Sequence, residues 1–191
     1  MIKITKNPIV ILSNYRTGST ALCNHLAKQH NLKNFNEPHC HKWPDFISHV
    51  LKNKSPKYIL KFMPDQIIEY PLYQKILNSD CFKIRLYRKN KIDQISSYYI
   101  CTMTNRWGRT RKEAVEEYQV PIDTGQVRYS IERILKNDQL LDSQNIEFDI
   151  TCFYEDIGVL ENNHNLITVS PLNILEIKSV IKDHINLKGE I

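Results

Sequence analysis

Residues 8–20 read "PIVILSNYRTGST", a short apolar run followed by a turn that contains one glycine and then two hydroxyl residues. The continuous aliphatic residues of 8–13 are typical of a strand that is buried on both faces of a parallel sheet. Gly18 can adopt the positive φ that a tight turn requires, and apolar residues four apart then predict a helix over Ser19–Gln29. The stretch therefore predicts a strand, a turn and a helix that begins beside the carboxyl end of the strand.

The same alternation of strand and helix patterns continues along the chain. We expect further strands at 57–63, 81–88 and 146–152. We expect helices over a broken stretch at 64–78, at 91–104, at 127–141 and from Ser170 onward. Alternating strands and helices imply an α/β fold with three αβα layers and a central, mainly parallel sheet. No repeat or linker divides residues 1–191, so we expect a single domain.

Charge, cysteine content and the length of apolar stretches limit the kinds of ligand and of cellular location that we expect. The 26 Lys and Arg against 21 Asp and Glu give a formal charge of +5 without long basic runs, which suits a small anion at least as well as nucleic acid. The chain has five cysteines and no C-x-x-C pair, which indicates free thiols in a reducing compartment. We find no apolar stretch long enough for a signal peptide or a membrane span. We therefore expect a soluble, cytoplasmic protein that does not bind nucleic acid.

The turn after the first predicted strand has the features of an anion site. Ligands of open parallel sheets bind beyond the carboxyl ends of the strands, and a helix N-terminus favours anions. Arg16 would add a planar fork of donors, and the hydroxyl groups of Ser19 and Thr20 would add more. The ATP-binding pattern G-x-x-x-x-G-K-[ST] is absent because no lysine follows Gly18, which disfavours a small-molecule kinase. A plain turn capped by Ser19 or Thr20 is the alternative.

A second candidate anchor lies in "RLYRKNKIDQISSYY" (85–99). Arg88 ends a predicted strand, and Ser96 follows eight residues later on the inward half of the next helix. The two side chains can converge on one anion. The alternative is that Arg88 is a solvated charge at the rim and Ser96 a small packing residue.

Together, "YRTGST" (15–20) and "YRKNKIDQISSYY" (87–99) resemble the two nucleotide-binding signatures of the sulfotransferases that use 3′-phosphoadenosine-5′-phosphosulfate (PAPS). The resemblance implies a P-loop-like nucleotide-binding fold and PAPS as the cofactor, with adenosine 3′,5′-bisphosphate as its product. It implies that the first loop holds the 5′-phosphosulfate through Arg16, Thr17, Gly18, Ser19 and Thr20. It implies that Arg88 and Ser96 hold the 3′-phosphate.

Three further segments are similar to members of this family that act on sugars. "FNEPHCHKW" (35–43) is similar to the Glu-Pro segment of carbohydrate sulfotransferases, and "FYEDI" (153–157) to the Tyr-Glu-Asp motif of bacterial trehalose-type enzymes. "ILKFMPDQ" (59–66) is similar to the lysine segment near the sulfuryl group. The resemblance implies transfer to a hydroxyl group, with a carbohydrate as the candidate acceptor.

The same resemblance assigns catalytic roles. Arg16 and Lys61 would stabilise charge on the leaving phosphate, and Glu37 would take the proton of the acceptor. His39 and His41 are alternative bases. The family's Arg-Lys-Gly motif near the C-terminus is missing, so a catalytically inactive nucleotide-binding protein of the same fold is the alternative function.

Two further expectations concern metals and partners. Residues 23–41 contain a group of cysteines and histidines whose spacing matches no zinc pattern, so we predict no metal: Cys23, His25, His30, His39, Cys40 and His41. Glu155 and Asp156 are expected to brace the fold or to pair with a loop arginine. The polar segment 105–126 is a candidate interface for a homodimer.

Overall fold

The computed structural model describes residues 3–41, 43–52, 57–105, 107, 118–157 and 171–188. In this part of the chain, five parallel strands form one sheet in the order β2-β3-β1-β4-β5. The strands are β1 (Ile9–Ser13), β2 (Lys33–Asn36), β3 (Tyr58–Phe62), β4 (Phe82–Tyr87) and β5 (Ile150–Phe153). The sheet confirms the α/β class predicted from the sequence.

The central strand β1 is buried on both faces, as its unbroken apolar sequence predicts. Ile9 and Ile11 pack in a core cluster with residues of α1 (Ser19–Gln29). Val10 and Leu12 belong to a second cluster on the opposite face. That face is covered by α3 (Trp43–Lys52), α4 (Pro64–Glu69) and α5 (Pro71–Leu77). Helices on both sides of the sheet confirm the three-layer αβα architecture.

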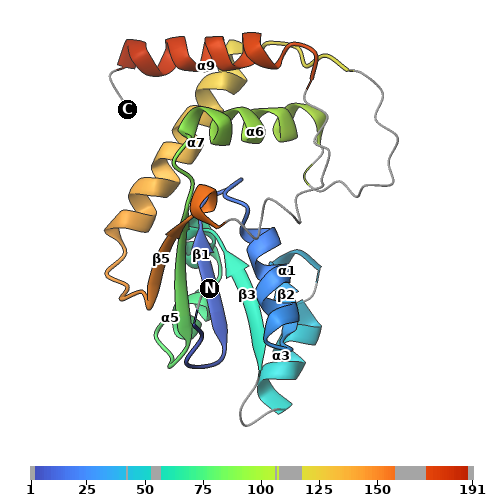
Figure 1. The fold of residues 1–191 in the computed structure, drawn as a ribbon, viewed down its shortest axis with the longest axis vertical. Helices are drawn as coiled ribbons and strands as arrows, with labels where there is room; N and C mark the ends of the chain where they lie inside the picture. Colours follow the sequence, from blue (N-terminus) through green and yellow to red (C-terminus); the bar gives the residue numbers. More distant parts are fainter. Residues whose placement is uncertain are drawn as a thin grey trace.

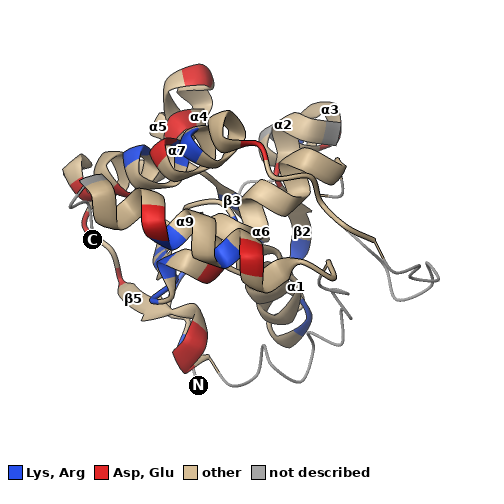
Figure 2. Ribbon diagram, turned by 90° about the horizontal axis from the view of Figure 1, so that it is seen from above, with Lys and Arg blue, Asp and Glu red and all other residues tan. Residues whose placement is uncertain are grey.

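Two helices, α6 (Lys91–Thr104) and α9 (Ile174–Lys188), lie beyond the carboxyl end of the sheet (Figure 1). A third, α7 (Thr124–Ser143), begins there and runs down beside the sheet, where its Leu141 joins the core cluster of Val10 and Leu12. Their apolar stripes form a third core cluster, which includes Tyr99, Ile131 and Ile181. Basic and acidic residues are interspersed on these helices when the molecule is seen from above (Figure 2). None of the described helices is long and apolar enough to cross a membrane.

The strand–turn–helix around residues 8–29 and the helix over 91–104 fall where the sequence predicts them. Strand β2 and helices α2 (Pro38–His41) and α3 were not predicted. In β2 only Phe35 is buried, because an edge strand of four residues has one covered face. The last strand begins at Ile150 rather than at residue 146. Half of the predicted dimer segment 105–126, residues 106 and 108–117, lies outside the described residues.

Candidate functional site

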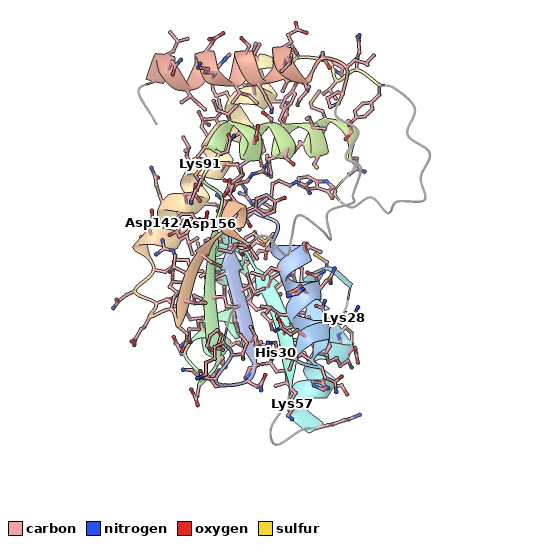
Figure 3. All side chains as sticks on the ribbon, in the orientation of Figure 1. Lys28, His30, Lys57, Lys91, Asp142 and Asp156 are labelled. Carbon is pink, nitrogen blue, oxygen red and sulfur yellow. The ribbon has the colours of Figure 1, made fainter. Side chains whose placement is uncertain are left out.

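The candidate residues gather at the carboxyl edge of the sheet because all five strands are parallel. The loop after β1 lies where the strand order reverses, between the ends of β3 and β4. Figure 3 shows Lys91 and Asp156 near this edge and Lys57, which precedes β3, at the opposite end. This edge is the place where open α/β sheets bind their ligands.

The loop after β1 is held by hydrogen bonds to α7 and within itself. The buried side chain of Asn14 donates to the carbonyl oxygen of Ile134 at 2.7 Å and to Asp138 Oδ1 at 3.0 Å. Its own oxygen accepts from the backbone N–H of Tyr15 at 2.7 Å. The Thr17 hydroxyl is buried and donates to the carbonyl oxygen of Asn14 at 2.9 Å. Thr17 therefore stabilises the loop from inside. Its hydroxyl can donate to a ligand only if it gives up this hydrogen bond to Asn14.

Gly18 is the N-cap of α1 and has φ 78°, and Arg16 also has a positive φ of 58°. A Cβ atom on Gly18 would lie 2.4 Å from the ring of Tyr154, so the glycine is required by a close contact as well as by its backbone conformation. Ser19 is buried and Thr20 is exposed at the start of the helix. The first backbone N–H groups of α1 have no partner within the helix, which leaves donors at this end of β1.

Arg16 and Arg88 lie side by side at this loop. Nη1 of Arg88 donates to the backbone oxygen of Arg16 at 3.1 Å, and its guanidinium lies over the Tyr154 ring at 5.1 Å. Nε of Arg88 is buried and has no hydrogen-bond partner among the described residues. Arg16 donates from Nε to the Ser97 hydroxyl at 2.9 Å and from Nη1 to the Trp107 carbonyl at 3.2 Å. Two positive charges with spare donors thus share one edge of the sheet.

The neighbouring serines of α6 have different roles. Ser96 is 1% exposed, and its hydroxyl donates to the carbonyl oxygen of Ile92 at 2.6 Å. Ser96 can donate to a ligand only after it gives up that bond. Ser97, which the sequence analysis did not select, accepts the hydrogen bond from Arg16. The helical spacing placed Ser96 on the inward half of α6, in agreement with its burial, but it did not show that the adjacent Ser97 is the serine in contact with Arg16.

Glu37 and Lys61, both predicted to be catalytic, form an ion pair with each other. Glu37 follows the edge strand β2 and Lys61 lies in the neighbouring β3, so the sheet places them together. The side chain of Lys61 is only 4% exposed, whereas that of Glu37 is 25% exposed. A nearly buried ammonium group requires a partner of opposite charge. Solvent reaches this ion pair mainly through the carboxylate of Glu37.

Two residues of α2 lie beside this ion pair. Nδ1 of His39 is hydrogen-bonded to the hydroxyl of the buried Tyr73 at 2.7 Å, and its Nε2 lies 3.3 Å from Sγ of Cys40. Burial lowers the pKa of His39 even though the charge of Glu37 opposes the shift. Burial, and then the charge of Glu37, raises the pKa of Cys40. The side chain of His41, the other predicted alternative base, lies outside the described residues.

The Tyr-Glu-Asp segment braces the site, as expected of Glu155 and Asp156. The Glu155 carboxylate accepts from the backbone N–H groups of Lys89 and Asn90, both at 3.0 Å. Asp156 pairs with the Lys89 ammonium group at 2.7 Å. Burial raises the pKa of Glu155, but the backbone hydrogen bonds outweigh it and leave the pKa below its usual value. These contacts fix the turn that presents Arg88.

A third group of polar residues was missed by the sequence analysis. Asp65, at the start of α4, pairs with Arg133 of α7 and accepts from the Tyr15 hydroxyl at 3.0 Å. The guanidinium of Arg133 also lies over the Tyr15 ring at 5.6 Å. Tyr15 thus ties the loop after β1 to two helices.

Neither the models of known protein families nor the sequences of curated proteins match this chain.

Proposed function

We propose that the protein binds PAPS and transfers its sulfuryl group to a hydroxyl acceptor. The 5′-phosphosulfate lies at the start of α1, against the backbone donors of Gly18, Ser19 and Thr20 and the side chain of Arg16. The 3′-phosphate binds Arg88. The hydrogen bond between Arg88 and the backbone of Arg16 is the observation that supports this reading most strongly, because it places the Arg88 guanidinium against the loop that carries Arg16.

The chemistry requires charge to be stabilised on a phosphate and a proton to be removed from the acceptor. The bond between the sulfuryl sulfur and the 5′-phosphate oxygen breaks, and a bond from that sulfur to the acceptor oxygen forms. The negative charge that develops on the phosphate is stabilised by Arg16 and by the N-terminus of α1. Glu37 takes the proton from the acceptor hydroxyl, and adenosine 3′,5′-bisphosphate leaves as the product.

Lys61 acts in this scheme through its ion pair. The buried ammonium group orients the Glu37 carboxylate, and it is also available to the leaving phosphate when Glu37 becomes neutral. Proton transfer to Glu37 would thus free the positive charge of Lys61 at the moment when negative charge develops. Lys61 also contacts the leaving phosphate directly.

A nucleotide-binding protein without transfer activity is the second candidate. Two observations favour it: the charge of Lys61 is already matched by Glu37, and the Ser96 hydroxyl is already bonded within α6. In this version Arg16 and Arg88 still bind the nucleotide, and no acceptor is turned over.

Incubation of the protein with sulfur-labelled PAPS and a panel of sugars and other alcohols separates these readings. We expect label in an acceptor and release of adenosine 3′,5′-bisphosphate, with a loss of about 10²–10⁴-fold in rate for Glu37→Gln, as for removal of a general base. Tight binding of the bisphosphate without label transfer would support the inactive protein. Transfer from ATP with Mg²⁺ instead would support a kinase and would refute the proposal.

A further inference from the structure

Three side chains with metal-binding atoms converge at the end of β2. The carboxylate of Glu37, the imidazole of His39 and the thiol of Cys40 each place a ligand atom within 4.8 Å of the other two. Nε2 of His39 lies 3.3 Å from Sγ of Cys40, and that sulfur lies 4.0 Å from Oε2 of Glu37. Cys40 is exposed, and Glu37 and His39 are half-buried, so an ion can reach all three.

The two separations that involve the sulfur are close to those of a metal site. A tetrahedral zinc ion with bonds of about 2.0–2.3 Å places its ligand atoms roughly 3.3–3.7 Å apart. The sulfur–nitrogen separation already fits, and the sulfur–oxygen separation is a few tenths of an ångström longer. Nitrogen, sulfur and one carboxylate oxygen favour a borderline transition metal over Mg²⁺ or Ca²⁺, which prefer oxygen ligands.

The hydrogen-bond partners of His39 and Glu37 are also arranged as in metal sites. Metal-binding histidines usually form a hydrogen bond through their other ring nitrogen, and metal-binding carboxylates are hydrogen-bonded in turn. Nδ1 of His39 is bonded to the hydroxyl of Tyr73, which is fully buried and whose ring stacks on Phe62 at 4.2 Å between centroids. Oε1 of Glu37 is held by Lys61, which leaves Oε2 on the side of Cys40.

We propose that Glu37, His39 and Cys40 bind one divalent transition-metal ion, with Zn²⁺ as the expected ion. Oε2, Nε2 and Sγ are the ligands, and a fourth position is open to solvent. The thiol proton of Cys40 leaves to water when the sulfur binds the ion, and the imidazole binds in its neutral form. The sequence predicted no metal because the spacing of the cysteines and histidines in residues 23–41 matches no zinc pattern, and Glu37 was not counted among the ligands.

The metal site does not depend on the proposed sulfuryl transfer. A bound ion occupies the oxygen of Glu37 that Lys61 leaves open, so both proposals together predict that Zn²⁺ slows transfer. Metal binding can be measured without nucleotide or acceptor. Failure of either proposal is therefore seen separately from failure of the other.

Titration of the full-length protein with Co²⁺, a spectroscopic substitute for Zn²⁺, tests the site. We expect one ion per chain with a sulfur-to-cobalt charge-transfer band that Zn²⁺ abolishes. The band should be lost in Cys40→Ser and kept in Cys152→Ser, a matched control at another free cysteine that is partly accessible. His39→Gln should weaken binding by at least the 10–100-fold that is typical of losing an outer hydrogen-bond partner.

Tyr73→Phe distinguishes a built site from chance binding to surface groups. The variant keeps the ring in the core and removes only the hydroxyl that orients His39, so we expect about 10–100-fold weaker binding with the Co²⁺ band retained at saturation. No sulfur-to-cobalt band in the wild-type protein would overturn the proposal. Binding that is equal in wild type, Cys40→Ser and His39→Gln would overturn it as well.

Discussion

Arg88 donates a hydrogen bond from Nη1 to the backbone carbonyl oxygen of Arg16, and the two residues follow neighbouring strands, β4 and β1. Seventy-two residues separate them in the chain. The guanidinium of Arg88 is also stacked on Tyr154, which follows β5 and covers Gly18. The ends of three strands are thus joined around the loop that we propose as the phosphosulfate site.

Replacement of Arg88 by alanine should weaken the binding of adenosine 3′,5′-bisphosphate by about 10–100-fold, because charge-assisted hydrogen bonds to a phosphate are lost. Arg128→Ala is the matched control, since Arg128 is exposed on α7 and its loss changes the net charge equally. Calorimetry should show AMP, which lacks the 3′-phosphate, binding equally to wild type and Arg88→Ala. Equal losses in both arginine variants would mean that only net charge matters.

Substitution of Gly18 by alanine should destabilise the protein by about 2 kcal/mol or more. The residue has φ 78°, and the new Cβ would overlap the Tyr154 ring, so strain and a displaced side chain both contribute. Gly125→Ala in α7 is the control, because Gly125 has no positive φ and its Cβ would approach only one side-chain oxygen of Asp123, at 3.1 Å, which can shift to relieve the contact. We expect that variant to change the free energy of unfolding by less than about 1 kcal/mol. Urea unfolding measures both, and equal effects would contradict the close contact at Gly18.

The ion pair of Glu37 and Lys61 should show strong coupling in a double-mutant cycle. Glu37→Gln leaves a buried ammonium group without its counter-ion and should cost about 2–4 kcal/mol in the free energy of unfolding. Lys61→Met in the same chain should recover most of that loss, because the unpaired buried charge is then gone. If the two single effects simply add, the carboxylate does not neutralise Lys61. These unfolding data also show whether a loss of transfer in Glu37→Gln reflects chemistry or folding.

Glu155 should contribute stability that depends on pH. Its folded pKa lies below the usual value of 4.5, so its contribution is present in full above that pH and is lost as the pH falls through the folded pKa. Glu155→Gln should therefore be less stable than wild type at pH 7 by about 1 kcal/mol, a value that allows for solvent screening. The difference should disappear in acid. Thermal unfolding at several pH values measures it, and a difference that persists unchanged at low pH would refute this role for the carboxylate.

The sequence predicted the parts of the fold that local patterns determine. The apolar run of β1, the glycine at its end and the four-residue spacing in α1 are each recorded in a few consecutive residues. Strand β2 was not predicted because its sequence "KNFN" has a single buried residue and so shows no apolar pattern. Its place beside β3 depends on pairing with a strand more than twenty residues away.

The candidate site was predictable in outline and not in its contacts. Arginines and a lysine at strand ends marked the edge of the sheet, since parallel strands all end there. The contact of Asp65 with Tyr15 and Arg133 joins residues 50 and 68 positions apart, and no local pattern encodes it. The pairing of Glu37 with Lys61 likewise follows from the order of strands β2 and β3 in the sheet.

A crystal structure of the protein with adenosine 3′,5′-bisphosphate tests the central claim most directly. We predict the 5′-phosphate at the N-terminus of α1 within hydrogen-bond distance of Arg16, and the 3′-phosphate within hydrogen-bond distance of Arg88. The open side of Glu37 should face the space where an acceptor would lie. A nucleotide bound elsewhere, or one whose 3′-phosphate makes no contact with Arg88, would contradict the account.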